Sequence, residues 1–407
     1  MTMIQDIRAT ADIFTDECID LMRKLIAIPA IAPENGGDGE YTKAKFLLNY
    51  LDKIGFDELK WYDAKDVRVS NNYRPNIVAK IYGKNREKTV WFISHLDIVP
   101  PGDLTKWDSN PYECVVKDGK IYGRGTEDNG QAIVSSVIAA KIVKKLGIVP
   151  AYNMGFVFAA DEEQGSNYGL KYLVKEGVFS KNDMAVVPDY GNKDGSVIEV
   201  AEKSIIWLKF SITGKQTHGS RPDTGINAHL AGAHLICDLD KTLKKKFNKT
   251  NSIFEPAYST FEVTKKENNV PNVNTIPGYD VFYFDMRILP EYSVETVIAH
   301  VEKCVRKIEN KFRVRVKFEA VNNEPAAPPT PVDSEVYMRL ARAIKELRGI
   351  EPKPVGVGGG TCAAILRKQG IPSVVWETLD GKAHEVNEYA WIKNILGDAA
   401  VFTAMML

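Results

Sequence analysis

The sequence predicts an α/β protein of two domains, with one domain inserted into the other. Three observations support this fold class. Apolar strands alternate with helices from residue 58 to residue 187, a different order of strands and helices fills residues 204–319, and the first kind of alternation resumes after a proline-rich linker. Alternation of this kind is typical of a sheet flanked by helices. The chain has 407 residues, which is also more than one hydrophobic core normally supports.

The first part of the chain predicts two helices followed by a largely buried mixed sheet. We expect helices at residues 4–29 and 41–54, because apolar positions recur there with helical spacing and Pro29, Pro33 and the Gly36-Gly37 pair separate the two segments. Strands are expected at 58–62, 75–82, 89–94, 154–160 and 183–187, and a long helix at 129–146. The strands at 89–94 and 154–160 are apolar on both faces, as in a sheet buried between helices.

The middle part has a different order. Strands at 205–213, 258–264, 279–288 and 314–318 alternate with helices at 226–246 and 293–310, which predicts an antiparallel βαββαβ (ferredoxin-like) sheet with helices on one face. Residues 322–329 form a proline-rich linker, after which a helix at 333–347 and a strand at 373–376 resume the first pattern. We therefore expect a larger α/β domain at residues 1–203 and 320–407 and an inserted α+β domain at 204–319.

Composition and charge limit the classes of partner. Lys plus Arg and Asp plus Glu both number 53, so the formal charge is zero and nothing favours nucleic acid or an anionic membrane. The five cysteines are odd in number and contain no C-x-x-C pair, which fits a reducing compartment. Asp6, Asp12 and Asp16 argue against a signal peptide, and no uncharged apolar run approaches the length of a membrane span. We expect a soluble, cytoplasmic protein.

Acidic and histidine side chains follow several strands of the larger domain. They are His95 and Asp97 after the strand at 89–94, Asp128 in a glycine-containing loop, Glu162 and Glu163 after the strand at 154–160, Asp189 after the strand at 183–187, and His384 in a later loop. Functional groups of an α/β sheet gather beyond the carboxyl ends of its strands. Carboxylates gathered there would repel one another unless a cation lay among them. The sequence therefore predicts a metal centre.

The charges suit two divalent ions. The carboxylates of Asp128, Glu163 and Asp189, together with a bridging hydroxide, would balance four positive charges, and neutral His95 and His384 would complete the ligand set. Imidazole and carboxylate ligands without a thiolate favour Zn²⁺, with Co²⁺ or Mn²⁺ as alternatives.

Two further acidic residues have expected roles beside the metals. Asp97 is expected to fix the tautomer of the His95 ring from behind, as carboxylates do for metal-bound histidines. Glu162, next to a ligand, is expected to act as the general base that takes a proton from a metal-bridging water and passes it to the leaving amine.

These residues resemble the motifs of the M20 metallopeptidases and their relatives, the zinc-dependent aminoacylase and carboxypeptidase group, over nearly the whole chain. The motifs are Ser-His-Leu-Asp-Ile-Val-Pro (94–100), Gly-Arg-Gly-Thr-Glu-Asp (123–128), Asp-Glu-Glu-Gln-Gly-Ser (161–166), Pro-Asp-Tyr-Gly (188–191) and His384. The resemblance implies that Asp128 bridges both metals and precedes a cis peptide bond. It implies that His95 and Asp189 bind one metal, and that Glu163 and His384 bind the other.

One departure from the family pattern leaves the subfamily open. After Asp128 this chain has Asn129-Gly130-Gln131, whereas many deacylase-like members have Met-Lys-Gly. Dipeptidase-like members vary here too, so the metal site is unaffected by the difference.

The inserted domain also resembles that of the family, where it is a lid and dimerisation domain. The segment 214–220 is similar to the lid motif, in which the histidine, here His218, reaches across a dimer to the substrate carbonyl in the partner's site. Asn274 and Arg287 lie in segments that resemble those whose Asn and Arg bind the substrate carboxylate, and a guanidinium fork suits a carboxylate. The resemblance further implies that the loop of Gly358, Gly359, Gly360 and Thr361 lines the substrate pocket.

The glycine-rich segment 356–361 could also suggest a dinucleotide cradle, because it follows a strand and opens a helix. Thr361 replaces the third glycine of that fingerprint and no lysine precedes it, which argues against nucleotide binding.

We therefore expect a co-catalytic zinc hydrolase that cleaves the amide bond of N-acyl amino acids, as deacetylases and desuccinylases do, and that works as a homodimer. A dipeptidase or carboxypeptidase acting on dipeptides is the alternative within the same chemistry. A non-catalytic binding or scaffold protein on this fold is the alternative from another class.

Overall fold

The computed structural model describes residues 2–407 and divides the chain into two compact units. Unit 1 comprises residues up to 200, 330–354 and 361–407, and unit 2 comprises residues 201–329 and 355–360. The sequence predicted an inserted domain at 204–319, whereas unit 2 also contains the linker and the strand end at 355–357. Hydrogen bonds explain why residues 355–357 belong to unit 2. Gly356 N donates to Ile253 O, and Lys203 N donates to Val357 O. The roles expected for the two domains stay predictions.

A mixed sheet of eight strands forms the centre of unit 1. In spatial order the strands are β1 (Glu58–Lys65), β2 (Tyr73–Ile81), β6 (Tyr152–Ala159), β3 (Asn85–His95), β7 (Met184–Asn192), β16 (Ser373–Thr378), β8 (Val197–Glu202) and β15 (Lys353–Val357). β3 runs parallel to β6 and β7, and β16 runs parallel to β7. β2 pairs antiparallel with β1 and β6, and β8 pairs antiparallel with β16. The carboxyl ends of β6, β3, β7 and β16 therefore meet at one edge of the sheet.

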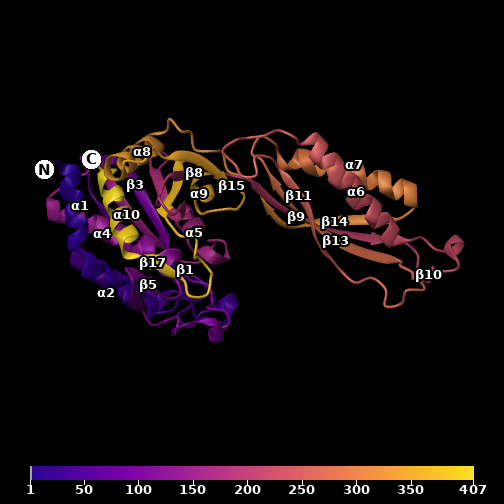
Figure 1. Ribbon diagram of the computed structural model, residues 1–407, viewed down its shortest axis with the longest axis horizontal. Coiled ribbons are helices and arrows are strands. Elements are labelled where there is room, and N and C mark those ends of the chain that lie inside the picture. The colour runs from indigo at the N-terminus through magenta and orange to yellow at the C-terminus, as the bar shows by residue number, and fades with distance from the viewer. Residues whose placement is uncertain (1) are drawn as a thin grey trace. The chain divides into compact units, whose positions relative to one another are not determined.

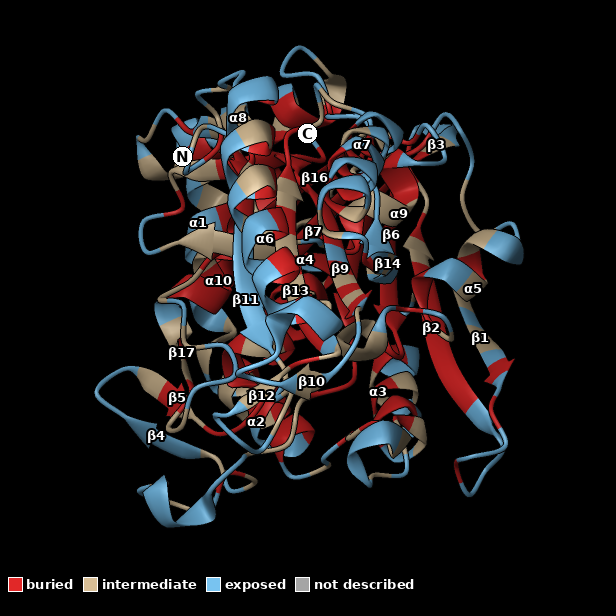
Figure 2. Ribbon diagram, turned by 90° about the vertical axis from the view of Figure 1, so that its right-hand side faces the viewer, coloured by how far each residue is buried: buried red, intermediate tan, exposed pale blue. Residues whose placement is uncertain are grey.

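Helices cover both faces of this sheet. They are α1 (Met3–Ile13), α2 (Thr15–Ile26), α3 (Tyr41–Leu51), α4 (Gln131–Leu146), α5 (Leu170–Lys175), α8 (Glu335–Arg348), α9 (Ala363–Arg367) and α10 (Ile392–Ala404). Successive residues of β3 face opposite sides of the sheet. Trp91 packs in one buried cluster with Leu170 of α5 and Leu366 of α9, whereas the Phe92 ring lies 4.9 Å from that of Phe402 in α10. Figure 2 shows most of β2 coloured as buried, whereas β1 at the edge of the sheet is mostly exposed or intermediate.

Unit 2 is an antiparallel sheet with two long helices on one face (Figure 1). The sheet order is β11 (Thr260–Lys266), β13 (Tyr279–Ile288), β9 (Ser204–Thr213) and β14 (Arg315–Glu324), and the helices are α6 (Ala228–Lys246) and α7 (Val294–Phe312). Two short strands, β10 (Thr217–His218) and β12 (Thr275–Ile276), form a ribbon. Inward-facing aromatic residues fill the core, where the rings of Phe210 and Phe282 stack 4.9 Å apart.

The predicted fold class is confirmed, including the mixed sheet of the larger domain and the βαββαβ order of the smaller one. One expected element differs. The helix predicted at residues 4–29 is two helices that meet at Phe14, where the ψ angle of 13° leaves the helical region. The side chain of Thr15 donates a hydrogen bond to the carbonyl oxygen of Asp12 beside this break. Such a local side-chain bond competes with helical pairing.

Unit 1 also contains a second, smaller sheet. The strands β4 (Val115–Lys117), β5 (Lys120–Tyr122) and β17 (Tyr389–Trp391) form a separate three-stranded sheet in unit 1. Across residues 2–407, no helix is both long enough and apolar enough to cross a lipid bilayer.

Candidate metal centre

Six acidic and histidine side chains of unit 1 come together beyond the carboxyl ends of the parallel strands. They form two groups whose potential ligand atoms lie within 4.8 Å of one another: His95, Glu162 and Asp189 in one, and Asp128, Glu163 and His384 in the other. β3 supplies His95 as its last residue, β7 supplies Asp189, and the turn after β6 supplies both glutamates. The sheet thus gathers residues that are almost 300 positions apart in the chain.

Asp128 connects the two groups. Its Oδ1 lies 2.9 Å from Nε2 of His95, and its Oδ2 lies 3.1 Å from Nε2 of His384. His95 Nε2 is 3.8 Å from Oδ1 of Asp189, and His384 Nε2 is 3.0 Å from Oε1 of Glu163. One carboxylate therefore presents one oxygen to each group, which is the arrangement that a bridging ligand requires. The peptide bond after Asp128 is cis, as the family resemblance implied.

The ionisable groups of this centre perturb one another strongly. Burial opposes ionisation of Asp128, but His384 and His95 outweigh it and hold the pKa of Asp128 well below its usual range. Hydrogen bonds with Asp128 and Glu163 raise the pKa of His384 to about 10. Burial raises the pKa of Glu162 to about 8, with repulsion from Asp189 acting in the same direction.

Burial also raises the pKa of Asp189 to about 6, despite its contact with His95. Buried negative charge is therefore in excess at this carboxylate too. Carboxylates that crowd one another in this way are stabilised by cations. Imidazole nitrogens and carboxylate oxygens are also the donors that zinc and related divalent ions prefer. The residues present therefore fit two divalent metal ions.

The His95 ring is fixed mainly by the backbone of Asp97. Nδ1 lies 3.0 Å from the carbonyl oxygen of Asp97 and 3.4 Å from its carboxylate Oδ1. A carbonyl oxygen can only accept a hydrogen bond, so Nδ1 carries a proton, and the neutral form of the ring would present the lone pair of Nε2 to a metal. The sequence assigned this orientation to the Asp97 side chain, whereas the shorter contact comes from its main chain.

The Asp97 carboxylate also organises the turn after β6. Its two oxygens accept hydrogen bonds from the amides of Glu162 and Glu163, each at 3.0 Å. Burial opposes ionisation of Asp97, but His95 and these two amides keep its pKa below the usual value. A buried carboxylate thus fixes the backbone of both glutamates.

Two glutamates that were not predicted as site residues join the loops of Asp128 and His384. The Glu388 carboxylate accepts hydrogen bonds from the amides of Gly125, Glu127 and Asp128 at 2.9–3.0 Å. In return, the Glu127 carboxylate accepts hydrogen bonds from the amides of Asp380 and Ala383 at 2.7 and 3.0 Å. We call this pair of interactions the loop tie.

The sequence gives only a weak indication of the loop tie. Glu127 directly precedes a predicted ligand and Glu388 lies four positions after another, yet both residues are buried. A buried acidic residue needs partners, but the sequence alone does not show burial in a loop.

A thiol also contacts the centre. Sγ of Cys362 lies 3.4 Å from Oε1 of Glu162 and 3.4 Å from Oγ of Ser166. Cys362 is buried, and all five cysteines of the chain are free thiols. No pattern in the sequence placed Cys362 near Glu162, because the five cysteines are far apart and form no motif.

The predicted substrate residues of unit 2 fall into two sets. His218 lies in the β10–β12 ribbon, where it pairs with Thr275, and Asn274 directly precedes β12, where its carbonyl oxygen accepts from Gly219 N at 2.6 Å. The ribbon continues the pairing of β9 with β13 beyond Thr213. Nδ1 of His218 lies 2.8 Å from Oγ of Ser220, and the side chain is exposed.

Arg287 lies at the other end of β13. Nε and Nη2 donate to the Asp285 carboxylate at 2.7 and 3.0 Å, and Nη1 donates to Gly358 O at 2.8 Å. The structure thus joins Arg287 to the predicted glycine loop, where added Cβ atoms on Gly358 and Gly359 would meet nothing within 4 Å. β13 has 10 residues, so at about 3.4 Å per residue roughly 30 Å separate Arg287 from the ribbon in one chain.

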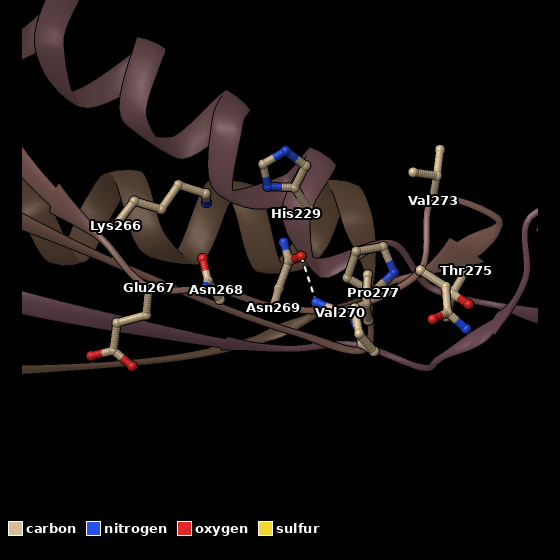
Figure 3. A pocket seen from close by; sticks show the side chains of 11 residues that line it. His229, Lys266, Glu267, Asn268, Asn269, Val270, Val273, Thr275 and Pro277 are labelled. Atoms are coloured by element: carbon tan, nitrogen blue, oxygen red, sulfur yellow. Dashed lines mark hydrogen bonds between the residues drawn. The ribbon is translucent and has the colours of Figure 1, made fainter.

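A pocket of about 960 Å³ lies beside the ribbon (Figure 3). His229, Lys266 and Asn269 line it, together with residues 270–273. Nζ of Lys266 donates to both oxygens of the buried Asp280 at 2.8 and 2.6 Å. The pocket belongs to unit 2 and contains none of the six side chains of the candidate metal centre.

Comparison with known proteins gives a consistent picture. Residues 91–407 match the profile of "Peptidase family M20/M25/M40". An uncharacterized metallohydrolase of Methanocaldococcus jannaschii is 41% identical, and the alignment covers 95% of this chain and 98% of that protein. A succinyl-diaminopimelate desuccinylase of Rickettsia bellii is 27% identical, with 92% of each chain covered.

Solved structures share the fold. A Bacillus subtilis protein called a dinuclear metal binding peptidase from the M20 family superposes with a TM-score of 0.67 at 15% identity. The superposition covers 97% of this chain and 98% of that one.

Proposed function

The chain belongs to peptidase family M20/M25/M40, and from that premise we propose that it hydrolyses the amide bond of N-acyl amino acids at a pair of zinc ions. The observation that carries the proposal is the position of Asp128 between His95 and His384, with Glu162 next to the Glu163 donor. Similarity to a desuccinylase over 92% of the chain supports an acyl amino acid as substrate.

The proposed metal ligands are His95, Asp128, Glu163, Asp189 and His384. When bound, two divalent ions would lower the pKa of a water molecule and polarise the substrate carbonyl. Imidazole and carboxylate donors without a thiolate favour zinc over softer metals, with cobalt or manganese as alternatives.

Glu162 is the proposed general base. It would take a proton from the attacking water and give it to the leaving amine, so its carboxylate must keep a fixed place beside the ligands. The two hydrogen bonds from the Glu162 and Glu163 amides to Asp97 support this assignment, because they fix the backbone that carries the base. The Cys362 thiol, 3.4 Å from Oε1, restrains the side chain.

Arg287 is the proposed binder of the substrate carboxylate. The guanidinium has more N–H groups than its contacts with Asp285 and Gly358 use, so it can still grip a carboxylate. The open surroundings of Gly358 and Gly359 support a substrate role for the loop of Gly358, Gly359, Gly360 and Thr361.

We further propose a homodimer in which His218 and Asn274 serve the site of the partner chain. The length of β13 supports this arrangement, because one chain holds His218 and Asn274 far from Arg287. His218 would donate a hydrogen bond to the substrate carbonyl as negative charge develops on its oxygen. The free thiols suit a reducing compartment such as the cytoplasm.

The test is a hydrolysis screen of zinc-loaded protein with acetylornithine, succinyl-diaminopimelate and dipeptides as parallel substrates. We expect release of the free amine from an acyl amino acid and a loss of about 10³-fold or more in kcat for Glu162→Gln, with metal content unchanged. Cleavage of dipeptides alone would indicate a dipeptidase. No hydrolysis of any substrate by the unmutated protein would contradict the proposal and favour a binding or scaffold role.

Removal of the metals is the second test. Dialysis against a chelator should abolish hydrolysis, and added Zn²⁺ should restore it, because no side chain of the centre replaces the Lewis acid. Full activity in chelated protein whose metal content has been measured as zero would contradict the proposal.

A further inference from the structure

We propose that Glu40 and Arg74 are positioning residues that hold the turn at residues 160–163 and thereby keep Glu162 and Glu163 in place. We call this segment the ligand turn. The inference rests on the proposed function for the role of Glu162, whereas the role of Glu163 as a metal ligand can be tested without activity.

Each of the four successive amides of the ligand turn donates to a buried side chain. The amide of Ala160 donates to Oδ1 of Asn76 at 3.0 Å, and the amide of Asp161 donates to Oε1 of Glu40 at 3.3 Å. The next two amides donate to Asp97, as described above. Ala160 and Asp161 are buried, so their amides need acceptors from the protein, and the side chains of Asn76 and Glu40 supply them.

Glu40 is itself fixed by Arg74. Nε of Arg74 donates to Oε2 of Glu40 at 2.5 Å, Nη2 donates to Oε1, and both side chains are fully buried. Arg74 stands on β2 with Asn76, and Glu40 precedes α3. Oε1 of Glu40 therefore receives the Asp161 amide while a two-pronged ion pair fixes its orientation.

Arg74 also reaches the ligand turn directly. Its Nη1 lies 3.4 Å from Oδ1 of Asp161 and 3.6 Å from Oδ2 of Asp66. Asp161 has a φ angle of 65°, in the left-handed region that a residue other than glycine rarely adopts. Its other oxygen accepts the amide of Tyr168 at 3.0 Å. Asp161, the residue before the proposed base, thus adopts an unusual backbone conformation beside Arg74, with one carboxylate oxygen bonded to the amide of Tyr168.

Stability alone does not account for this network. A buried ion pair often contributes little net stability, because removing both charges from water offsets their attraction. Its most direct consequence here is geometric, since it fixes the backbone one residue from Glu162. Displacement of a reacting group by about 1 Å can cost about 100-fold in rate.

The chain offers a matched control in Arg367 and Glu199. This pair is also buried and two-pronged, with both N–O distances at 2.9 Å. Nε of Arg367 donates to Ser373 O rather than to any residue of the ligand turn. Breaking either pair should cost comparable stability, whereas only the pair of Glu40 and Arg74 should affect the ligand turn.

The experiment compares Glu40→Gln with Glu199→Gln in the full-length zinc-loaded protein. For Glu40→Gln we expect kcat to fall about ten-fold or more with KM changed less than about three-fold, because positioning acts on the transition state. We also expect the zinc content to fall from two ions per chain toward one, because Glu163 loses its fixed place. The control should keep both ions and a kcat near that of the unmutated protein.

A milder variant, Arg74→Lys, guards against loss of folding. It keeps the cation but removes the two-pronged hydrogen bonding to Glu40. We expect smaller decreases in kcat and zinc content than for Glu40→Gln, in a protein with a normal circular dichroism spectrum. Zinc content and kcat equal to those of the control in both Arg74→Lys and folded Glu40→Gln would overturn the inference. If the unmutated protein hydrolyses nothing, the proposed function fails, and zinc content alone then decides whether Glu40 positions the ligand turn.

Discussion

At the scale of single residues, carboxylates that bind no metal do much of the structural work in the candidate centre. Asp97 fixes the amides of Glu162 and Glu163, and Glu388 fixes the amide of Asp128. A carboxylate that accepts several amide hydrogen bonds is a rigid anchor, since each bond is charge-assisted. These anchors place loop residues with the accuracy that ligand atoms require.

The loop tie gives the first residue-scale prediction. Glu388→Gln replaces a carboxylate that serves three amides and the Arg124 guanidinium by an amide with only one acceptor oxygen. We expect a loss of about 2–4 kcal/mol in the free energy of unfolding, from the unpaired buried donors, and weaker zinc binding. Urea denaturation and zinc titration measure the two effects.

Glu385→Gln is the matched control, because Glu385 lies in the same loop but is exposed. Among the described contacts, its carboxylate forms an ion pair with Lys382 at 2.7 Å. We expect it to change the free energy of unfolding by less than about 0.5 kcal/mol. Equal effects of the two substitutions would contradict the anchoring role of Glu388.

A second residue-scale prediction concerns acid stability away from the centre. Partial burial opposes ionisation of Glu335, but hydrogen bonds from Lys88 and Arg339 outweigh it and lower the pKa of Glu335 to about 2. A folded pKa below the unfolded value means that ionised Glu335 stabilises the fold above pH 4.5 and that this stabilisation disappears as pH falls toward 2.

Glu335→Gln tests this sign. The side chain is 34% exposed, so solvent screening reduces the effect, and we expect a loss of about 1–2 kcal/mol at pH 7. The difference between the variant and the unmutated protein should shrink from pH 4.5 downward, as measured by urea denaturation at several pH values. A difference that stays constant from pH 7 to pH 3 would show that the ion pairs contribute nothing.

At the scale of elements, the centre depends on how closely β7 and β16 approach each other. A Cβ atom added to Gly191, two residues after Asp189, would lie 1.7 Å from the carbonyl oxygen of Glu377 on β16. Backbone oxygen cannot move away as the end of a flexible side chain can. The strand that carries Asp189 therefore needs glycine at this position.

Gly191→Ala should accordingly push the two strands apart at the metal centre. We expect a loss of about 2–3 kcal/mol in the free energy of unfolding, as for other overpacked sites, together with reduced zinc content. Gly397→Ala in α10 is the control, because the nearest atom to its added Cβ is the guanidinium of Arg348 at 3.2 Å. The control should be neutral or slightly stabilising in a helix, and thermal melts of both variants decide the matter.

At the scale of the whole molecule, the proposed dimer explains why predicted substrate residues occupy opposite ends of one sheet. The β10–β12 ribbon carries His218 and lies beyond one end of β13, whereas Arg287 lies near the other end. A symmetric dimer uses the same surface of both chains and exchanges equivalent residues between them. His218 of each chain can then act in the site of the other.

Mixing two inactive variants tests this exchange. His218→Ala keeps Glu162, and Glu162→Gln keeps His218, so a mixed dimer has one complete site if His218 acts across the dimer. Random reassociation of equal amounts should restore about a quarter of the unmutated activity, since half of the dimers are mixed and each has one working site. If the mixtures stay as inactive as the separate variants, His218 acts in the site of its own chain or takes no part in the reaction.

The sequence by itself determined the fold class, because hydrophobic periodicity and strand–helix order are local properties of the chain. It also singled out His95, Asp128, Glu162, Glu163, Asp189 and His384 as candidates, because strand ends in an α/β sheet converge and the motifs resemble those of a family. The periodicity at 4–29 predicted one helix where Phe14 separates two, and the side-chain bond from Thr15 to Asp12 beside the break competes with helical pairing.

Only the tertiary structure decided what holds those candidates in place. The loop tie, the contact of Cys362 with Glu162 and the network of Glu40 and Arg74 join residues 34 to 263 positions apart in the chain. No local pattern reveals such pairs, because an acidic residue in a loop is usually solvated and gives no sign of burial. Burial is a property of the assembled sheet and its covering helices, and it turns ordinary carboxylates into anchors of the candidate metal centre.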